Sequence, residues 1–231
     1  MTLEARVLEA LGTVYDPELD EPVTTLGFVG SVVVTAAGDV SVRLRRPTPL
    51  CAPNFAYLMA FDARAAVRRV PGVAAATVVL EDHYTGDEIN AAVGADAGFG
   101  AAFPGETAGD LGALRELFRR KALVARQARL CEAQLAAGLD AQAVVSLHLG
   151  DLPDGVDTRR CRALRAALGL PHGPDAPALV AGDGRAIGAD ELPMWLRRAR
   201  LVRVSLDANG GICRSLLRVR HGIEESEEVP A

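Results

Sequence analysis

The sequence predicts an α+β protein: a small α-β-β-α-β assembly domain followed by a second α/β region. Three observations support this fold class. Apolar residues recur at helical spacing near the N-terminus, two valine-rich alternating segments flank a glycine-containing turn, and a long amphipathic segment follows after residue 110. The 231 residues are enough for two small domains. We place the first domain at residues 1–92, a linker at 93–109 and a C-terminal extension at 110–231.

The elements of the first domain follow from periodicity and from turn residues. Residues 2–14 form a helix that ends at a proline-containing turn, because proline disfavours helical geometry in the residue before it. Residues 29–35 and 40–45 alternate in polarity and form a β-hairpin. Residues 53–69 form a second helix, and the valine-rich residues 73–81 form a third strand. The helices should cover one face of this sheet.

The extension alternates in character. Residues 93–109 are rich in Ala and Gly and look like a linker. Asp157 is the expected cap of one helix, and Gly210-Gly211 is expected to form a turn ahead of a helix or strand over Ile212–Arg220. The expected helices are Leu111–Ala137, Thr158–Leu168 and Glu191–Arg200, and the expected strands are Ala143–Leu149, Ala178–Ala181 and Leu201–Leu206.

Composition excludes several function classes. The net charge is −5 and the pI is about 5.4, which argues against nucleic-acid binding. No apolar stretch approaches the ~20 residues that span a bilayer, and the N-terminus lacks the apolar region of a signal peptide, so we expect a cytoplasmic protein. Its four cysteines should be reduced there, and no two of them form a C-x-x-C pair.

Cys51 is the first candidate functional residue. It lies in a strand-to-helix loop, with Pro53 and Asn54 at the start of the helix. The backbone N–H groups and dipole of a helix N-terminus favour an anion, and a cysteine there can have a lowered pKa. The alternative is a small, buried and inert side chain.

The turn Asp16-Pro17-Glu18 and two loop residues could complete such a site. Two carboxylates near a thiolate can bind iron, although Asp16 and Glu18 could equally belong to a simple turn. Gly27 could supply a positive φ angle or a close backbone approach. Thr48 could donate a hydrogen bond to a cysteine sulfur or cap the loop.

Four further residues are weighed against structural alternatives. His83 follows the third strand and could be a metal ligand, a base beside Cys51 or an exposed polar residue. Cys213 follows Gly210-Gly211 and is either a second functional thiol or a core residue. Cys131 and Cys161 fall inside expected helices, so we expect both to be packing residues.

Residues 3–90 resemble the iron–sulfur cluster assembly domain of SufT-like and PaaD-like proteins. The matching motifs occur in the family's order: Val14 to Leu19, Thr25 to Val29, the loop from Pro47 to Pro53, and the turn from Val70 to Val73. Residues 105–231 lie outside the resemblance and look like an extension found in longer members. Leu50 departs from the family, because many members have a small or polar residue directly before the cysteine.

The resemblance implies a maturation factor rather than an enzyme. Cys51 occupies the position of the family's loop cysteine, Asp16 and Glu18 match its acidic turn, and Thr48 matches a loop threonine. The cargo would be a transiently bound iron–sulfur cluster or iron, delivered to a client apo-metalloprotein such as an oxygenase. One chain offers too few well-placed thiols for Cys₄ ligation, so a homodimer is expected, with Cys213 or His83 completing the site.

The second hypothesis is a metal-free adaptor or chaperone for a multicomponent monooxygenase subunit. The expected helix Leu111–Ala137 and the acidic segment Glu224–Glu228 would then be its docking elements. This hypothesis predicts a client complex that does not need Cys51.

Overall fold

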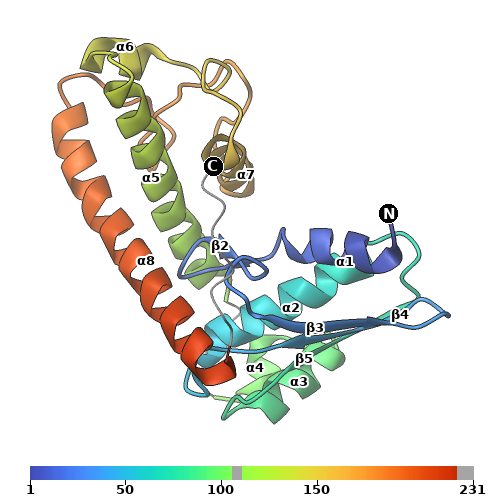
Figure 1. Ribbon diagram of the computed structural model, residues 1–231. Helices are drawn as coiled ribbons and strands as arrows, with labels where there is room; N and C mark the ends of the chain where they lie inside the picture. The colour runs from blue at the N-terminus through green and yellow to red at the C-terminus, as the bar shows by residue number, and fades with distance from the viewer. Residues whose placement is uncertain (106–110, 223–231) are drawn as a thin grey trace. The chain divides into compact units, whose positions relative to one another are not determined.

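The computed structural model describes residues 1–105 and 111–222. The chain forms two compact units: unit 1 comprises Met1–Gly112 with Ala208–Ala231, and unit 2 comprises Ala113–Asp207. Unit 1 contains a mixed three-stranded sheet with helices, and unit 2 is mostly helical (Figure 1). The α+β class predicted from the sequence is therefore confirmed, but the extension is not an α/β region.

The sheet of unit 1 has the order β3-β4-β5. Strands β3 (Val29–Val34) and β4 (Asp39–Leu44) form the antiparallel hairpin, and β5 (Ala75–Leu80) lies parallel to β4. The parallel pairing requires a crossover, which helix α2 (Pro53–Arg68) supplies. The loop that carries Cys51 is the first part of this crossover.

One face of the sheet is buried and the other is not. Helices α1 (Leu3–Leu11) and α2 lie on the buried face (Figure 1). Every second side chain of β4 and β5 points into this core, which is the alternation that the sequence shows. These residues are Val40, Val42, Leu44, Ala76, Val78 and Leu80.

Part of the expected linker is structured and belongs to the core of unit 1. Helix α3 (Gly86–Gly94) begins before the expected linker and ends just inside it, helix α4 (Phe99–Ala102) lies within it, and Phe99 and Phe103 are buried. The Phe99 ring contacts that of Tyr57 edge to face, with 5.5 Å between the ring centroids. The Ala- and Gly-rich composition of this segment did not indicate α4. The buried Phe99 and Phe103, four residues apart, pack this segment into the core of unit 1. Residues 106–109 of the expected linker lie outside the described residues.

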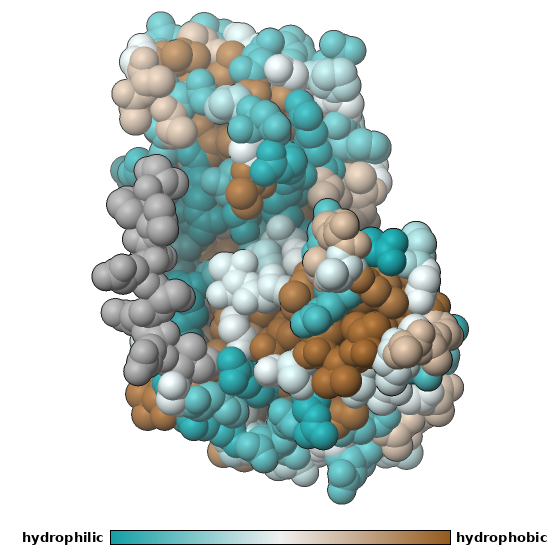
Figure 2. Space-filling view, turned by 45° about the vertical axis from the view of Figure 1, so that its right-hand side comes forward, coloured by the Kyte–Doolittle hydropathy of each residue, from teal (hydrophilic) through white to brown (hydrophobic). Residues whose placement is uncertain are grey.

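A surface pocket of about 420 Å³ lies along α1 and α2. Figure 2 shows hydrophobic residues gathered on the surface of this part of the molecule. The pocket shares no lining residue with the loop that carries Cys51. Its lining consists of Met1, Arg6, Glu9, Ala10, Thr13, Ala66, Arg69, Val70 and Pro71.

Helix α8 (Leu192–His221) is 30 residues long and replaces several expected elements. The expected strand Leu201–Leu206 and the expected turn at Gly210-Gly211 are both wrong, because both segments lie inside this helix. A Cβ added to Gly210 would lie 2.9 Å from Oε1 of Glu21, which follows the acidic turn. The lack of a side chain at Gly210 therefore allows α8 to pack closely on Glu21 within unit 1, and Gly210 does not form a turn.

The remaining helices of unit 2 correct two further expectations. The expected strand Ala143–Leu149 is largely helix α6 (Ala141–Ser146), because the Asp140 side chain caps the N–H of Ala143 at 2.8 Å. Helix α7 (Val156–Ala167) has Gly155 at its N-cap, so Asp157 is not the cap. Asp157 instead accepts a hydrogen bond from Arg126 at 2.6 Å.

Helix α5 (Gly112–Ala136) runs through the core of unit 2. The side-chain amide of its Gln127 accepts a hydrogen bond from the N–H of Val180 and donates one to the carbonyl of Val180. These two bonds replace those that a neighbouring strand would make with the expected strand at 178–181. The buried Arg165 donates to Gln127 and to the carbonyls of Pro177 and Ala178. Isolated bridges at His148–Pro177 and Val180–Ala186 are the remaining β-structure described in this unit.

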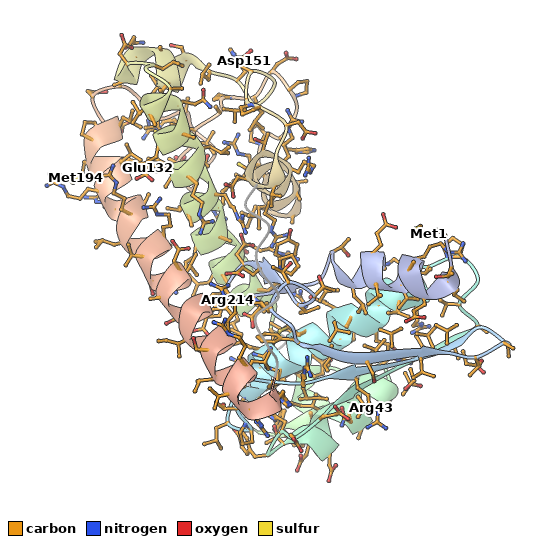
Figure 3. All side chains as sticks on the ribbon, viewed as in Figure 1. Met1, Arg43, Glu132, Asp151, Met194 and Arg214 are labelled. Atoms are coloured by element: carbon orange, nitrogen blue, oxygen red, sulfur yellow. The ribbon has the colours of Figure 1, made fainter. Side chains whose placement is uncertain are left out.

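A surface ion-pair group joins α5 to the first half of α8. Glu132 of α5, labelled in Figure 3, accepts hydrogen bonds from Arg200 and Arg203 of α8 at 2.6 and 2.5 Å. Cys131, next to Glu132, is buried as expected, and so is Cys161 of α7. These two cysteines are packing residues of unit 2.

Candidate thiol site

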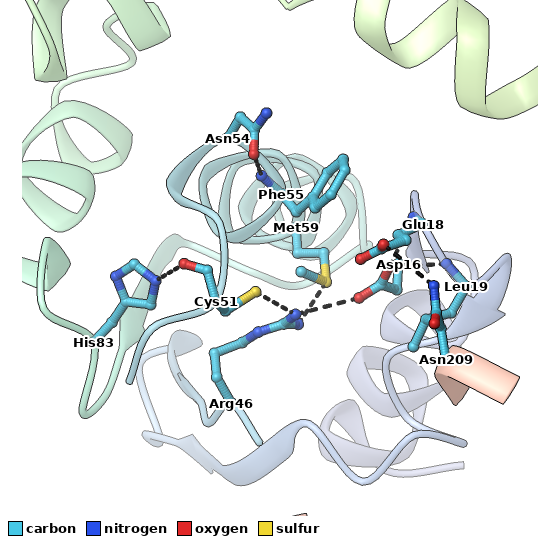
Figure 4. A network of polar contacts seen from close by, with 10 residues as sticks. All are labelled: Asp16, Glu18, Leu19, Arg46, Cys51, Asn54, Phe55, Met59, His83 and Asn209. Atoms are coloured by element: carbon cyan, nitrogen blue, oxygen red, sulfur yellow. Dashed lines mark hydrogen bonds and ion pairs between the residues drawn. The ribbon is translucent and has the colours of Figure 1, made fainter. Parts of the chain in front are cut away.

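Cys51 lies half-buried between the end of β4 and the start of α2 (Figure 4). The guanidinium of Arg46 reaches it from the end of β4, and Nη2 donates a hydrogen bond to the Cys51 sulfur at 2.8 Å. Nη1 of the same guanidinium donates to the sulfur of Met59 at 3.0 Å. The sulfur atoms of Cys51 and Met59 therefore both accept hydrogen bonds from the buried guanidinium of Arg46.

The positive charge of Arg46 is balanced by Asp16. Nη2 of Arg46 lies 3.3 Å from Oδ2 of Asp16, and the two residues are only 4% and 2% exposed. The Phe28 ring covers the guanidinium at 4.3 Å from the ring centroid. The Nε–H is also buried and has no hydrogen-bond partner among the described residues. These contacts fix the position of the Arg46 guanidinium and leave its Nε–H group without a hydrogen-bond acceptor among the described residues.

Asp16 also shapes the acidic turn. Its Oδ1 accepts hydrogen bonds from the backbone N–H groups of Glu18 and Leu19 at 2.8 and 3.1 Å. This is an Asx-type turn, so the simple turn interpretation is correct for Asp16. The second carboxylate oxygen remains for Arg46, and Asp16 therefore joins the turn to the thiol site.

His83 approaches the backbone of Cys51 rather than its sulfur. Its Nε2 lies 2.7 Å from the Cys51 carbonyl oxygen, and the Thr85 N–H donates to Nδ1 at 3.2 Å. Because Nδ1 accepts, Nε2 carries the hydrogen and donates. Burial lowers the pKa of His83, which favours this neutral ring. In this arrangement His83 positions the loop and has no ring nitrogen left for a metal ion or for the thiol proton.

Of the two alternatives for Cys51, a lowered pKa is not what the structure favours. Burial is the largest influence and raises the pKa of the thiol, whereas the charge and hydrogen bond of Arg46 lower it. The negative charges of Asp16 and Glu18 raise it further. Desolvation therefore outweighs the influence of Arg46, which is the main group that stabilises the thiolate. The departure at Leu50 leaves that side chain pointing to solvent, 74% exposed.

Cys213 comes to the same site from the far end of the chain. It lies in α8, four residues after Asn209 and four before Leu217, and both of these contact unit 1. Burial raises the pKa of Cys213, as do the charges of Asp16, Cys51 and Glu18, while Arg46 lowers it. The structure thus brings together Cys51, Cys213, Asp16 and Glu18, which the sequence analysis singled out separately.

Two glycines allow α8 to approach unit 1 closely. Gly27 has a φ angle of +73°, and a Cβ there would lie 3.2 Å from the Leu217 side chain. Gly27 also accepts a hydrogen bond from Arg45 at 3.0 Å. Next to Gly210, Arg214 donates to Glu21 at 2.5 Å, and Figure 3 labels Arg214 on the helix. The positive φ and close approach expected of Gly27 are both present.

The remaining expected residues support the loop. Pro53 is the first residue of α2, and Asn54 Oδ1 accepts the N–H of Phe55 at 2.9 Å. Thr48 is half-buried, and within the described residues it does not hydrogen-bond the Cys51 sulfur. Across residues 1–105 and 111–222, no three His, Cys, Asp or Glu side chains are arranged to hold a metal ion by themselves.

Sequence analysis missed Arg46, Met59 and Phe28. The available signal was a pair of arginines, Arg45-Arg46, at the end of a strand five residues before a cysteine. A charged residue at a strand end is usually solvated, so the pattern did not indicate burial. The stacking on Phe28 and the contact with Met59 depend on tertiary packing.

The fold and the site together define an α+β domain that presents one loop thiol beside a buried arginine. A model of the iron–sulfur cluster assembly protein family matches residues 4–78, which include Asp16, Arg46 and Cys51. Through this domain the chain belongs to the iron–sulfur cluster assembly protein family.

The chain is also similar to the uncharacterized protein MJ1129 of Methanocaldococcus jannaschii. The two are 34% identical over 90 residues, which is 39% of this chain and 93% of that protein. The family model ends well before Cys213. The described helices include none that is long and apolar enough to cross a membrane.

Proposed function

We propose that this protein is a maturation factor that carries an iron–sulfur cluster or iron to a client metalloprotein, with Cys51 as the key thiol. Membership of the family supports the assembly role. The observation that carries the role of Cys51 is its hydrogen bond from the buried Arg46 within the family domain. Thiolate is the ligand form of cysteine, and this contact stabilises it.

The geometry suits a cargo that is bound and then released. The Cys51 sulfur is half-buried, which limits its contact with water, and its guanidinium partner compensates the charge when the proton leaves. A cluster usually needs four cysteine ligands. The others would come from Cys213, from the client or from a second copy in a homodimer. A site with few ligands of its own favours transfer over permanent storage.

The protein acts as a carrier rather than as a thiol enzyme in this proposal. A nucleophilic cysteine is activated by an adjacent base or by a lowered pKa, and burial raises the pKa of Cys51. His83, the candidate base, donates to the Cys51 carbonyl and accepts from Thr85, so both ring nitrogens are already engaged.

Anaerobic reconstitution with iron and sulfide tests the proposal. The wild type should bind both and absorb visible light, and Cys51→Ala should lose most of this absorbance. Cys161→Ala is the matched control, because it removes a buried thiol of unit 2 and leaves the site untouched. A colourless wild type, or colour that persists in Cys51→Ala, would refute the role of Cys51 as the key ligand.

A metal-free adaptor for an oxygenase subunit is the second candidate function. One observation favours it: Ile212, Leu216 and Val219 of α8 are 59%, 43% and 85% exposed and share one side of the helix. The expected docking helix α5 is instead buried from Ala122 to Cys131, apart from Val124 and Arg129. The acidic segment Glu224–Glu228 lies outside the described residues.

A binding assay separates the two functions. An adaptor should bind its oxygenase subunit equally well as wild type and as Cys51→Ala, and Ile212→Ser with Val219→Ser should weaken the complex. A cluster carrier should lose client activation in Cys51→Ala whether or not the complex forms.

A further inference from the structure

The last turns of α8 form a continuous contact with the thiol site. Asn209, Cys213, Leu217 and His221 recur every four residues and therefore lie on one face of the helix. Asn209 donates to Glu18 at 3.5 Å, and His221 contacts the carbonyl of Arg46 at 3.3 Å. One end of this face is thus fixed to the acidic turn and the other to the backbone just after β4.

We propose that Cys51 and Cys213 form a single two-thiol site for a soft, thiophilic metal ion, in which the C-terminal extension supplies the second sulfur. The inference rests on the proposed function and names how the carrier holds its iron. It concerns a residue that the family domain, residues 4–78, does not contain.

The rotation of the helix directs Cys213 inward. Its neighbours on the same face are Asn209, which bonds Glu18, and Leu217, which is buried in the core of unit 1. Cys213 is half-buried and packs against the same core cluster, whereas Ile212, one residue before it, is exposed. A thiol one turn from each of these neighbours lies on the face of α8 that packs on the acidic turn and on the core of unit 1.

The backbone is adapted to this approach. Gly210 and Gly27 have no side chain at two positions where the end of α8 packs closely on the rest of unit 1. At Gly210 a Cβ would meet the Glu21 carboxylate, and at Gly27 it would meet Leu217. A side chain at either position would crowd the Glu21 carboxylate or the Leu217 side chain, and at Gly27 it would also strain the positive φ angle.

The charges suit a divalent soft ion. Asp16 and Arg46 already compensate each other, so the two thiols are the groups that change charge. On binding, both thiols lose their protons to solvent, two metal–sulfur bonds form, and two thiolates neutralise one divalent cation. Soft thiolate ligands select iron, zinc or cadmium over magnesium and calcium. The absence of a third arranged ligand in the described residues leaves coordination positions for the client.

Cadmium titration of the reduced full-length protein tests the site. Cadmium–thiolate binding gives ultraviolet absorbance that counts sulfur ligands, and the fold is checked by circular dichroism. The wild type should bind one ion with two thiolates. Cys51→Ser and Cys213→Ser should each weaken binding by about tenfold or more, since loss of even a supporting group costs that much. Cys161→Ser should bind like the wild type.

A trivalent arsenical, which bridges two adjacent thiols, provides an independent measurement. It should add one arsenic per wild-type chain, by mass, and none across the pair in either single serine variant. Cadmium affinity unchanged in Cys213→Ser, together with no bridged arsenic in the wild type, would overturn the two-thiol site.

The outcomes also separate this inference from the proposed function. If iron–sulfide colour needs Cys51 but not Cys213, the carrier function stands and the two-thiol site fails. If cadmium needs both cysteines but the wild type stays colourless with iron and sulfide, the site stands and the cluster cargo fails.

Discussion

Nη2 of Arg46 donates to the sulfur of Cys51 at 2.8 Å and lies 3.3 Å from the carboxylate of Asp16. One guanidinium nitrogen therefore joins the acidic turn to the loop thiol, two motifs separated by more than thirty residues of sequence. Because Arg46 is always protonated, it provides this site with a permanent positive charge.

Arg46 should control the reactivity of Cys51. In Arg46→Gln the charge that lowers the pKa of Cys51 is lost while burial continues to raise it, so the pKa should rise. The pH profile of Cys51 alkylation, followed by mass spectrometry, should shift to higher pH. Arg43→Gln, on the exposed face of the sheet, is the control and should leave the profile unchanged. A profile that moves to lower pH would contradict the assigned role of Arg46.

Asp16→Asn should destabilise unit 1 even though it preserves the turn. The asparagine oxygen can still accept the N–H groups of Glu18 and Leu19, but Arg46 becomes a buried charge without its partner. Removal of one member of a buried pair costs about 3–5 kcal/mol in free energy of unfolding. Denaturant unfolding measures this loss. The double variant Asp16→Asn/Arg46→Gln should lose less than the sum of the single variants, and simple additivity would argue against the pair.

Leu217→Ala should loosen the end of α8. Leu217 is buried in the core of unit 1, and truncation of a buried leucine costs about 2–5 kcal/mol. Hydrogen exchange should become faster at residues 209–221. Val219→Ala, two residues away and exposed, should change stability by no more than about 0.5 kcal/mol. Equal effects of the two variants would show that this face of α8 does not pack on unit 1.

The four cysteines should differ in reactivity. Burial raises the pKa of Cys131 to about 11 and also raises the pKa of Cys161, and these two side chains are buried, whereas Cys51 and Cys213 are half-buried. At pH 8 only about one Cys131 in a thousand is a thiolate. Native reduced protein should be alkylated at Cys51 and Cys213, and all four cysteines should react after denaturation. Early labelling of Cys131 or Cys161 would contradict their burial.

The local elements of the first domain could be predicted from sequence because their signals are local. Alternation of Val40, Val42 and Leu44 reports a half-buried strand, and Pro53 marks a helix start. The resemblance to the family assigned Asp16 and Cys51 to one site, and in the structure both contact Arg46.

The partners across the site could not be predicted, because they depend on packing. Alternation over Leu201–Leu206 is typical of a strand, yet this segment is helical within the 30 residues of α8. The Gly210-Gly211 pair is typical of a turn, but Gly210 fits a helix against Glu21. Both errors concealed that Cys213 lies in a helix that packs on the core of unit 1.

The packing of the end of α8 within unit 1 has a consequence for biosynthesis. The contacts of Asn209 with Glu18 and of Arg214 with Glu21 join residues 191 and 193 positions apart. A ribosome releases residues 4–78 long before it releases these partners, so the nascent family domain is first present without the contacts of α8. Only a chain translated beyond residue 214 can form both contacts, and a product terminated before residue 213 would lack Cys213.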